Sequence, residues 1–445
     1  MCFYQKYFPI ITLFYLFSFF TSSGQVLINL DTAFTLLDKN NLDVQKMKYR
    51  IQMVMQDNKD AKNAFLPKIN AGLSQNNNFG LSFDQVAGQL ITGNKWTNSA
   101  NANLTFQTII FQGFALKNQL NKSHLEIESS QLEITSLKRT LKLQLLRIYF
   151  TAITNKALYT SILNQIKYSK ELLLLQREQF NVGTKTSLDV SLAESQVATD
   201  EFNLLTTKNN YYNSILELKE LLNIPLTDSL ILDESEGLKL SDSIVLSNPR
   251  ENFSFVEANP FIELSKLNIK KAQLAHKTAR NSRLPTLSLT GGYNTNYSSE
   301  RTDFSTGTYM PFYDQLIQNR SLYFGFSLSV PIFDTFKIRG LEKKTKVEIL
   351  IQKLEKDKIT LEQEKIYKQS YQELHLAQQE YLLAKKQLIS LKSALNSMIE
   401  RHKLGLSSST DFSKALLDHN QAEFKVITTG YNLIYFQKMI TILQN

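Results

Sequence analysis

The sequence predicts a chain of mixed helices and strands, built from two copies of one unit. Three patterns support this prediction. The chain matches itself at a nearly constant offset, apolar residues alternate with polar ones in four short runs, and apolar residues recur every seven positions over very long stretches. Each unit is expected to hold a helix, two strands, a very long helix, a tight turn and a shorter returning helix.

The repeat organises the chain from residue 25 to the last residue. Asn41–Pro67 matches Asn259–Pro285, and the stretch that begins at Phe111 matches the one that begins at Phe333. Because the second match runs without a gap to Asn445, the two copies are joined by a single linker. The predicted segments are a first repeat at 25–223, a linker at 224–257 and a second repeat at 258–445.

Four runs of period-two alternation predict strands with one apolar and one polar face. They begin after Pro67, at Ala100, after Pro285 and at Ser321. Each has about 10 residues, which is the length of a tilted transmembrane strand. A soluble hairpin packed on one face is the alternative, but the fourfold recurrence and the apolar N-terminus favour membrane strands. Aromatic residues lie towards the loops, as in the aromatic girdle of membrane barrels: Phe79, Trp96, Tyr293 and Tyr297.

Very long helices follow the strands in each copy. Apolar residues recur every seven positions from Leu120 to Ile148 and again from Val347 to Leu395, which predicts coiled-coil packing. Neither Gly nor Pro interrupts the stretch between Gly113 and Phe180. Such a helix would span roughly 100 Å at 1.5 Å per residue, which is more than an ordinary globular domain needs.

The two long helices are expected to end at tight, polar turns. Gly183 and Gly405 stand where a left-handed residue would end each helix. Asp189 and Asp411 follow each glycine by six positions and can cap the returning helices.

The N-terminus resembles a secretory leader. Lys6 is followed by the apolar run Pro9–Phe20, and small residues precede Gln25, so residues 1–24 are predicted to be a removed signal peptide. A membrane anchor is the alternative, although the run is short for one. The only cysteine, Cys2, lies in this segment, so the mature chain is expected to have no disulfide and no thiolate metal site.

The composition and the motifs also argue against several classes of function. The formal net charge of +9 is scattered along the chain, whereas a nucleic-acid binder usually concentrates its charge on one face. No two of the five histidines have the spacing of helical metal ligands, and there is no phosphate-binding loop. The sequence therefore predicts no enzyme activity, no metal and no cofactor.

The strand count predicts the assembly. Four strands cannot close a barrel, and open strand edges are not stable in lipid. Two chains would give a barrel filled by its own side chains, whereas three chains would leave a lumen. The fold class is therefore predicted as coiled-coil hairpins that form an α-barrel, with four transmembrane strands per chain in a shared 12-stranded trimeric β-barrel.

These features together resemble the TolC-like outer membrane efflux protein family over essentially the whole mature chain. The marks of the resemblance are Phe65-Leu66-Pro67 and Arg283-Leu284-Pro285 before strands, Val330–Asp334 after them, and the two glycine turns. The resemblance implies an outer-membrane export duct with a periplasmic helical tunnel, in a tripartite efflux or type I secretion system. Its partners would be two further copies, outer-membrane lipid, a periplasmic adaptor, and an inner-membrane transporter of the RND, ABC or MFS type.

The resemblance also implies roles for the turns. An adaptor would dock there, on Val182, Gly183, Thr184, Leu404, Gly405 and Leu406. Asp189 and Asp411 would line the closed aperture or hold it shut. The alternative for the glycines is plain helix termination, and for the aspartates plain helix capping.

Three positions depart from the pattern of well-known members. His402 stands in place of an aromatic residue, Ser407 in place of a basic one and Lys414 in place of a second acid. Lys185 is a candidate substitute for the missing base. The cargo, the pump and the adaptor cannot be read from the sequence. A passive porin or an envelope-spanning coiled-coil tether remain the alternative functions.

Overall fold

The computed structural model describes residues 26–233, 259–303, 305–404 and 406–444. The predicted signal peptide, most of the predicted linker and Gly405 therefore lie outside the described residues. The helices of the described part are α1 (Leu30–Asn40), α2 (Leu42–Asn63), α3 (Ala115–Asn181), α4 (Ser187–Leu222), α7 (Pro260–Asn281), α8 (Phe312–Gln318), α9 (Lys337–Lys403) and α10 (Ser409–Gln444). Its strands are β1 (Val26–Ile28), β2 (Lys68–Phe79), β3 (Ser82–Asp84), β4 (Gln89–Ile91), β5 (Trp96–Gln112), β6 (Leu230–Leu232), β7 (Thr286–Ser298) and β8 (Ser321–Ser329).

Corresponding helices of the two repeats have equal lengths. α3 and α9 each have 67 residues, α4 and α10 each have 36, and α2 and α7 each have 22. These three helices thus follow one another in the same order in both repeats. No helix in the described ranges combines the length and the apolar character that crossing a bilayer requires.

The described residues form two compact units. Unit 1 takes the described residues within 1–41, 144–246 and 376–437, and unit 2 takes those within 42–143, 247–375 and 438–445. α3 and α9 each span both units, with one part of the helix in unit 1 and the other part in unit 2.

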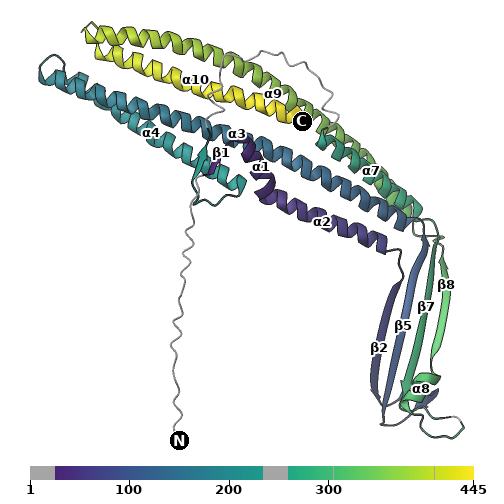
Figure 1. Ribbon diagram of the computed structural model, residues 1–445. Coiled ribbons are helices and arrows are strands. Elements are labelled where there is room, and N and C mark those ends of the chain that lie inside the picture. Colours follow the sequence, from purple (N-terminus) through teal and green to yellow (C-terminus); the bar gives the residue numbers. More distant parts are fainter. Residues whose placement is uncertain (1–25, 234–258, 304, 405, 445) are drawn as a thin grey trace, which may run out of the picture. The chain divides into compact units, whose positions relative to one another are not determined.

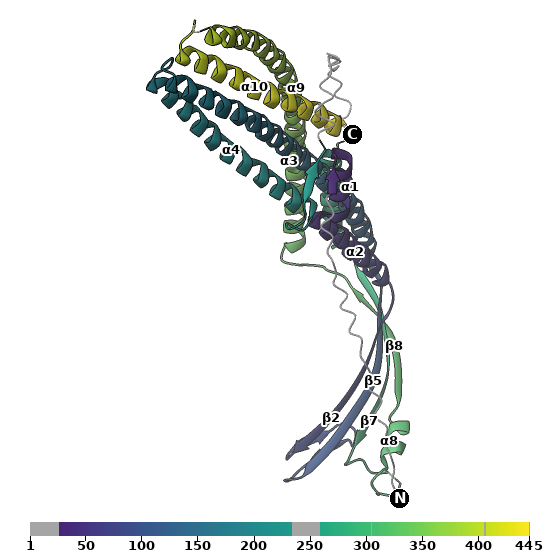
Figure 2. The ribbon, with the colours of Figure 1, turned by 60° about the vertical axis from the view of Figure 1, so that its left-hand side comes forward.

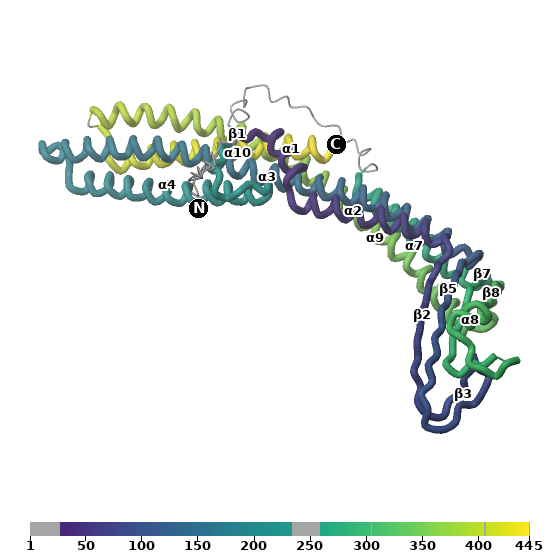
Figure 3. Tube along the Cα trace, turned by 60° about the horizontal axis from the view of Figure 1, so that its bottom comes forward, coloured from purple at the N-terminus to yellow at the C-terminus, as the bar shows by residue number. Residues whose placement is uncertain are grey.

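In unit 1 the helices lie side by side in the order α4, α3, α10 and α9 (Figures 1 and 3). Polar side chains join neighbours: Gln165 Nε2 of α3 donates to Asp200 of α4 at 2.6 Å, and Ser161 Oγ donates to Glu423 of α10 at 3.1 Å. β1 and β6 form a two-stranded parallel sheet at one side of these helices. β6 therefore places a short strand inside the segment predicted to be a linker.

The buried core of unit 1 surrounds Tyr149 of α3. This side chain is fully buried, and its hydroxyl donates to the carbonyl of Ile28 in β1 at 3.4 Å. Leu145, Leu218 and Leu222 are fully or almost fully buried as well. Buried residues of α3 and α4 thus share one core. The hydrogen bond from Tyr149 joins β1 to this core.

Unit 2 contains a four-stranded antiparallel sheet in the order β2-β5-β7-β8 (Figure 2). β2 and β8 are its edges, and neither pairs with another strand of the described chain on its outer side. β3 and β4 form a hairpin between β2 and β5, and α8 lies between β7 and β8. Helices α2, α7 and parts of α3 and α9 complete the unit, joined by contacts such as Asn58 Nδ2 to Ser123 Oγ at 2.8 Å.

The sheet has one apolar and one polar face, because directly paired residues in an antiparallel sheet share a face. Leu73 pairs with Ala102, and Leu104 pairs with Tyr293. Across the other face Asn103 pairs with Asn294. Large apolar side chains of both edge strands are exposed, with Leu73 and Phe324 among them. Burial of such apolar surface is favourable in water, so a large exposed apolar face marks a surface for a partner or a membrane.

Candidate functional site

The first predicted turn, between α3 and α4, has the hydrogen bonds of a Schellman motif. The amide of Thr184 donates to the carbonyl of Gln179, and that of Gly183 donates to Phe180, both at 2.9 Å. Gly183 has a φ of +78°, which a residue with a side chain rarely adopts. The glycine therefore ends α3 and satisfies carbonyls that would otherwise be unpaired.

The second predicted turn, between α9 and α10, has one of these two hydrogen bonds among its described residues. The amide of Leu406 donates to the carbonyl of Arg401 at 2.8 Å, in the place of the bond from Thr184 to Gln179. Val182 and Leu404 are 74% and 72% exposed. Each turn thus presents a large apolar side chain to its surroundings, next to a backbone that hydrogen bonds hold in place.

Asp189 and Asp411 cap the returning helices. The hydroxyl and the amide of Thr186 both donate to Asp189 Oδ2 at 2.8 Å, and the amide of Asp189 donates back to Thr186 Oγ1 at 3.3 Å. Ser408 Oγ donates to Asp411 Oδ2 at 2.7 Å, and the amide of Asp411 donates to Ser408 Oγ at 3.1 Å. Both aspartates therefore have the capping role that the sequence left open beside the aperture role.

Hydrogen bonding fixes the charge of Asp189. The hydroxyl of Ser409, together with the donors of Thr186, lowers the pKa of Asp189 from 3.8 to about 2. The carboxylate is therefore ionised at every physiological pH. Because its pKa is depressed in the folded chain, its contribution to stability is complete above pH 3.8 and is lost as the pH falls through about 2.

A side-chain hydrogen bond joins the two turns of unit 1. Lys185 Nζ of the first turn donates to Ser409 Oγ of the second at 3.4 Å. Because Ser409 also hydrogen-bonds Asp189, a single hydroxyl of α10 joins a cation and an anion of the first turn. Lys185 therefore links the two turns through a hydroxyl group. Its role as a substitute for the missing base stays a prediction.

His402 is the residue of this site whose contacts the sequence did not predict. Its ring stacks on Phe412 with centroids 4.8 Å apart, and its Nδ1 lies 3.3 Å from Ser407 Oγ. The Nε2 atom of the buried Gln176 in α3 lies within hydrogen-bond distance of His402 Nε2, at 3.2 Å. Burial, aided by the positive charge of Lys185, lowers the pKa of His402. His402 therefore joins α3 to the second turn.

A buried apolar cluster lies next to the contact between Gln176 and His402. Phe412, Leu416 and Leu395 form a buried cluster between α9 and α10, and Leu172 of α3 packs against it. Nothing in the sequence distinguishes Gln176 from other glutamines of α3, so only the structure brings it to His402. Lys414, the third departure from the family pattern, is exposed.

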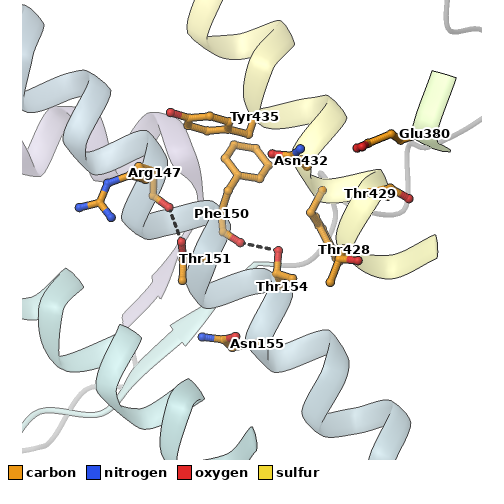
Figure 4. Close-up of a pocket in the computed structure, with 11 residues that line it drawn as sticks. Arg147, Phe150, Thr151, Thr154, Asn155, Glu380, Thr428, Thr429, Asn432 and Tyr435 are labelled. Atoms are coloured by element: carbon orange, nitrogen blue, oxygen red, sulfur yellow. Dashed lines mark hydrogen bonds between the residues drawn. The ribbon is translucent and has the colours of Figure 1, made fainter. Parts of the chain in front are cut away.

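A pocket of about 510 Å³ lies further along unit 1, between α3 and α10 (Figure 4). Thr151 Oγ1 donates to the carbonyl of Arg147, and Thr154 Oγ1 donates to that of Phe150, so both hydroxyls are engaged by their own helix. Phe150 also packs against Tyr435, with ring centroids 6.3 Å apart. This arrangement provides an aromatic and hydroxyl surface and does not resemble the nucleophile and base of a catalytic site.

Comparison with known proteins identifies the family. The family described as Outer membrane efflux protein matches residues 35–223 and 255–433, which is most of the chain and includes both turns. The chain belongs to the outer membrane efflux protein family. Members of this TolC-like family are outer-membrane transport channels, and the efflux protein described here shares their fold.

Individual relatives are distant in sequence. The outer membrane protein TolC of Escherichia coli (strain K12) is 22% identical over 298 residues, which cover 64% of this chain and 58% of TolC. The match thus spans less than two thirds of TolC. The VceC protein of Vibrio cholerae superimposes with a TM-score of 0.74 at 12% identity, covering 94% of this chain and 96% of VceC. The CmeC channel of Campylobacter jejuni gives 0.75 at 16% identity, with 93% and 85% covered.

Proposed function

We propose that this efflux protein is one subunit of an outer-membrane export duct of a tripartite efflux or type I secretion system. Three copies would close a 12-stranded barrel across the outer membrane, and their long helices would form a periplasmic tunnel. A periplasmic adaptor would dock at the turns, and an inner-membrane transporter of the RND, ABC or MFS type would supply the energy. The leader of residues 1–24 would direct each copy out of the cytoplasm, and the repeats at 25–223 and 258–445 would contribute two strands each.

The observation that carries this proposal is the sheet of unit 2. It has two unpaired edges, β2 and β8, and an exposed apolar face beside a face of neutral amides and hydroxyls. Open edges cost several kcal/mol per unpaired group in lipid, so a membrane sheet must close. Pairing of β8 with β2 of the next copy would join identical chains head to tail, and cyclic symmetry would then close the ring.

The native mass of the detergent-extracted protein tests this assembly. We expect three chains per particle after correction for bound detergent, because twelve strands leave a lumen whereas eight do not. Sedimentation combined with refractive-index detection would give the mass of protein alone. A single folded chain per particle would refute the shared barrel and would favour the envelope-spanning tether.

We extend the proposal to Asp411, which would form a ring of three carboxylates at the tunnel aperture. Asp411 is exposed, and such a ring attracts cations and repels anions. Asp411→Asn should therefore reduce the cation selectivity of the reconstituted channel severalfold, measured from the reversal potential in a salt gradient. Since Asp189 has a pKa of about 2, its own charge should not vary between pH 4 and pH 8.

The control for Asp411 separates the aperture role from the capping role. Ser408→Ala removes the hydroxyl that Asp411 bonds but keeps the carboxylate. If selectivity changes in Ser408→Ala and not in Asp411→Asn, the aspartate acts through the helix cap and the aperture role is wrong.

A further inference from the structure

The short helix α8 packs against the apolar face of the sheet at its loop end (Figure 1). Thr295 Oγ1 of β7 donates to the carbonyl of Leu316 in α8 at 2.7 Å, and the ring of Tyr297 meets that of Phe312 with centroids 5.0 Å apart. Thr295 and Tyr297 pair with Ala102 and Ala100 of β5. They therefore lie on the same face of the sheet as its apolar residues.

Helix α8 buries a polar residue and exposes two large apolar ones. Gln315 faces the sheet at 0% exposure, accepts a hydrogen bond from the amide of Ser298 and donates to the carbonyls of Ser298 and Met310, each at 2.9 Å. Tyr313 and Ile317 point away from the protein and are 76% and 56% exposed. A surface helix in water normally buries its apolar residues and exposes its polar ones. Asp314 and Gln318 are exposed as well, so the outer side of α8 places large apolar residues beside polar ones. Such a mixed side suits the boundary between an apolar phase and water.

The exposed side of α8 continues a belt of aromatic residues on the apolar face. Phe79 and Trp96 are directly paired at the loop end of β2 and β5, and their ring centroids are 5.1 Å apart. Tyr297 lies on the same face of β7, and Phe312 of α8 stacks edge-on against it. Aromatic side chains gather where a membrane meets water because their rings are apolar and their polar atoms reach the headgroups.

We propose that α8 is an interfacial anchor, which inserts Tyr313 and Ile317 into the outer boundary of the bilayer around the barrel. This inference rests on the proposed membrane barrel. A second copy of the chain fits this surface less well than lipid does, because α8 covers β7, which is an inner strand of the sheet. Neighbouring copies would join at the edge strands β2 and β8, whereas the face of an inner strand points outward to the lipid.

Fluorescence quenching by lipid tests the anchor. Trp96 is the only tryptophan, so Trp96→Phe gives a background without tryptophan. In that background Tyr313→Trp and, separately, Ile317→Trp would be reconstituted into phosphatidylcholine vesicles with brominated acyl chains. An interfacial helix lies ~5–10 Å deep at the headgroup and acyl boundary, so we expect about a twofold loss of fluorescence relative to unbrominated vesicles. Aqueous iodide should have little effect.

Two further positions separate this inference from the proposed function. Phe324→Trp reports on the apolar face of β8, and Tyr323→Trp reports on the polar face beside it. If bromine quenches Phe324→Trp but neither α8 position, the barrel stands and the anchor is refuted. Iodide quenching of the α8 positions would then show that they face water, and quenching by neither agent would show that protein covers them. If Phe324→Trp itself escapes bromine, the sheet does not face lipid and the proposed function fails.

Discussion

Gly113→Ala should destabilise the protein by about 2–4 kcal/mol, because two separate costs add at this residue. Gly113 follows β5 with a φ of +52°, a left-handed conformation that is unfavourable for alanine. A Cβ at this position would also lie less than 3.0 Å from the carbonyl oxygen of Asn281, which is backbone and cannot rotate away. The measurement is the loss of native structure on heating the detergent-extracted protein, compared at one scan rate because membrane proteins often unfold irreversibly.

The repeat provides the matched control for this prediction. Thr335 is the counterpart of Gly113 in the second repeat and has a φ of +55°, although it is β-branched. Thr335→Gly should therefore raise stability by about 1 kcal/mol, since glycine adopts this conformation without steric cost. If Gly113→Ala is harmless while Thr335→Gly destabilises, the left-handed residue is not what constrains this junction between strand and helix.

Local sequence patterns predict most of the elements of this fold. The period-two runs fall within β2, β5, β7 and β8, and the uninterrupted heptads correspond to α3 and α9. These elements are long and repeat their pattern many times, so each residue supports the assignment of its neighbours. The glycines at the turns were equally informative, because a left-handed residue after a long helix is a local requirement, as the φ of Gly183 shows.

The elements that the sequence missed depend on distant partners. β1 and β6 have three residues each, and Val26 pairs with Leu230 across most of a repeat. α8 was missed because its seven residues are too few to show a helical period, and because it exposes Tyr313 and Ile317 while it buries Gln315.

The candidate site was also only partly predictable. The positions of Asp189 and Asp411 after each glycine suggested helix caps, and the structure shows both caps. The bond between Gln176 and His402 joins residues that are 226 positions apart. No local periodicity encodes such a contact, since it depends on how α3 packs against α9 and α10.

The apolar tips of the two turns lead to the prediction with the largest functional effect. Val182→Asp combined with Leu404→Asp should abolish export, because both side chains are exposed and a docking adaptor would bury them. Truncation of a central interface residue commonly costs ~2 kcal/mol or more, and two buried charges should cost more than that. We therefore expect binding of the purified adaptor to weaken by at least about 100-fold, together with loss of resistance in cells that depend on this channel.

A matched substitution distinguishes lost docking from a damaged channel. Leu226→Asp makes the same chemical change at an exposed leucine that lies after α4, away from both turns. Surface substitutions outside an interface usually change stability by less than ~0.5 kcal/mol, so all three substitutions should leave the native mass unchanged. If the tip variant keeps its adaptor, or if Leu226→Asp loses it equally, the turns are not the docking surface. The double variant with Val182→Asp and Leu404→Asp could lose export while its reconstituted channel conducts as before. The defect would then lie in the connection to the pump, which is the result expected if the adaptor docks at the turns.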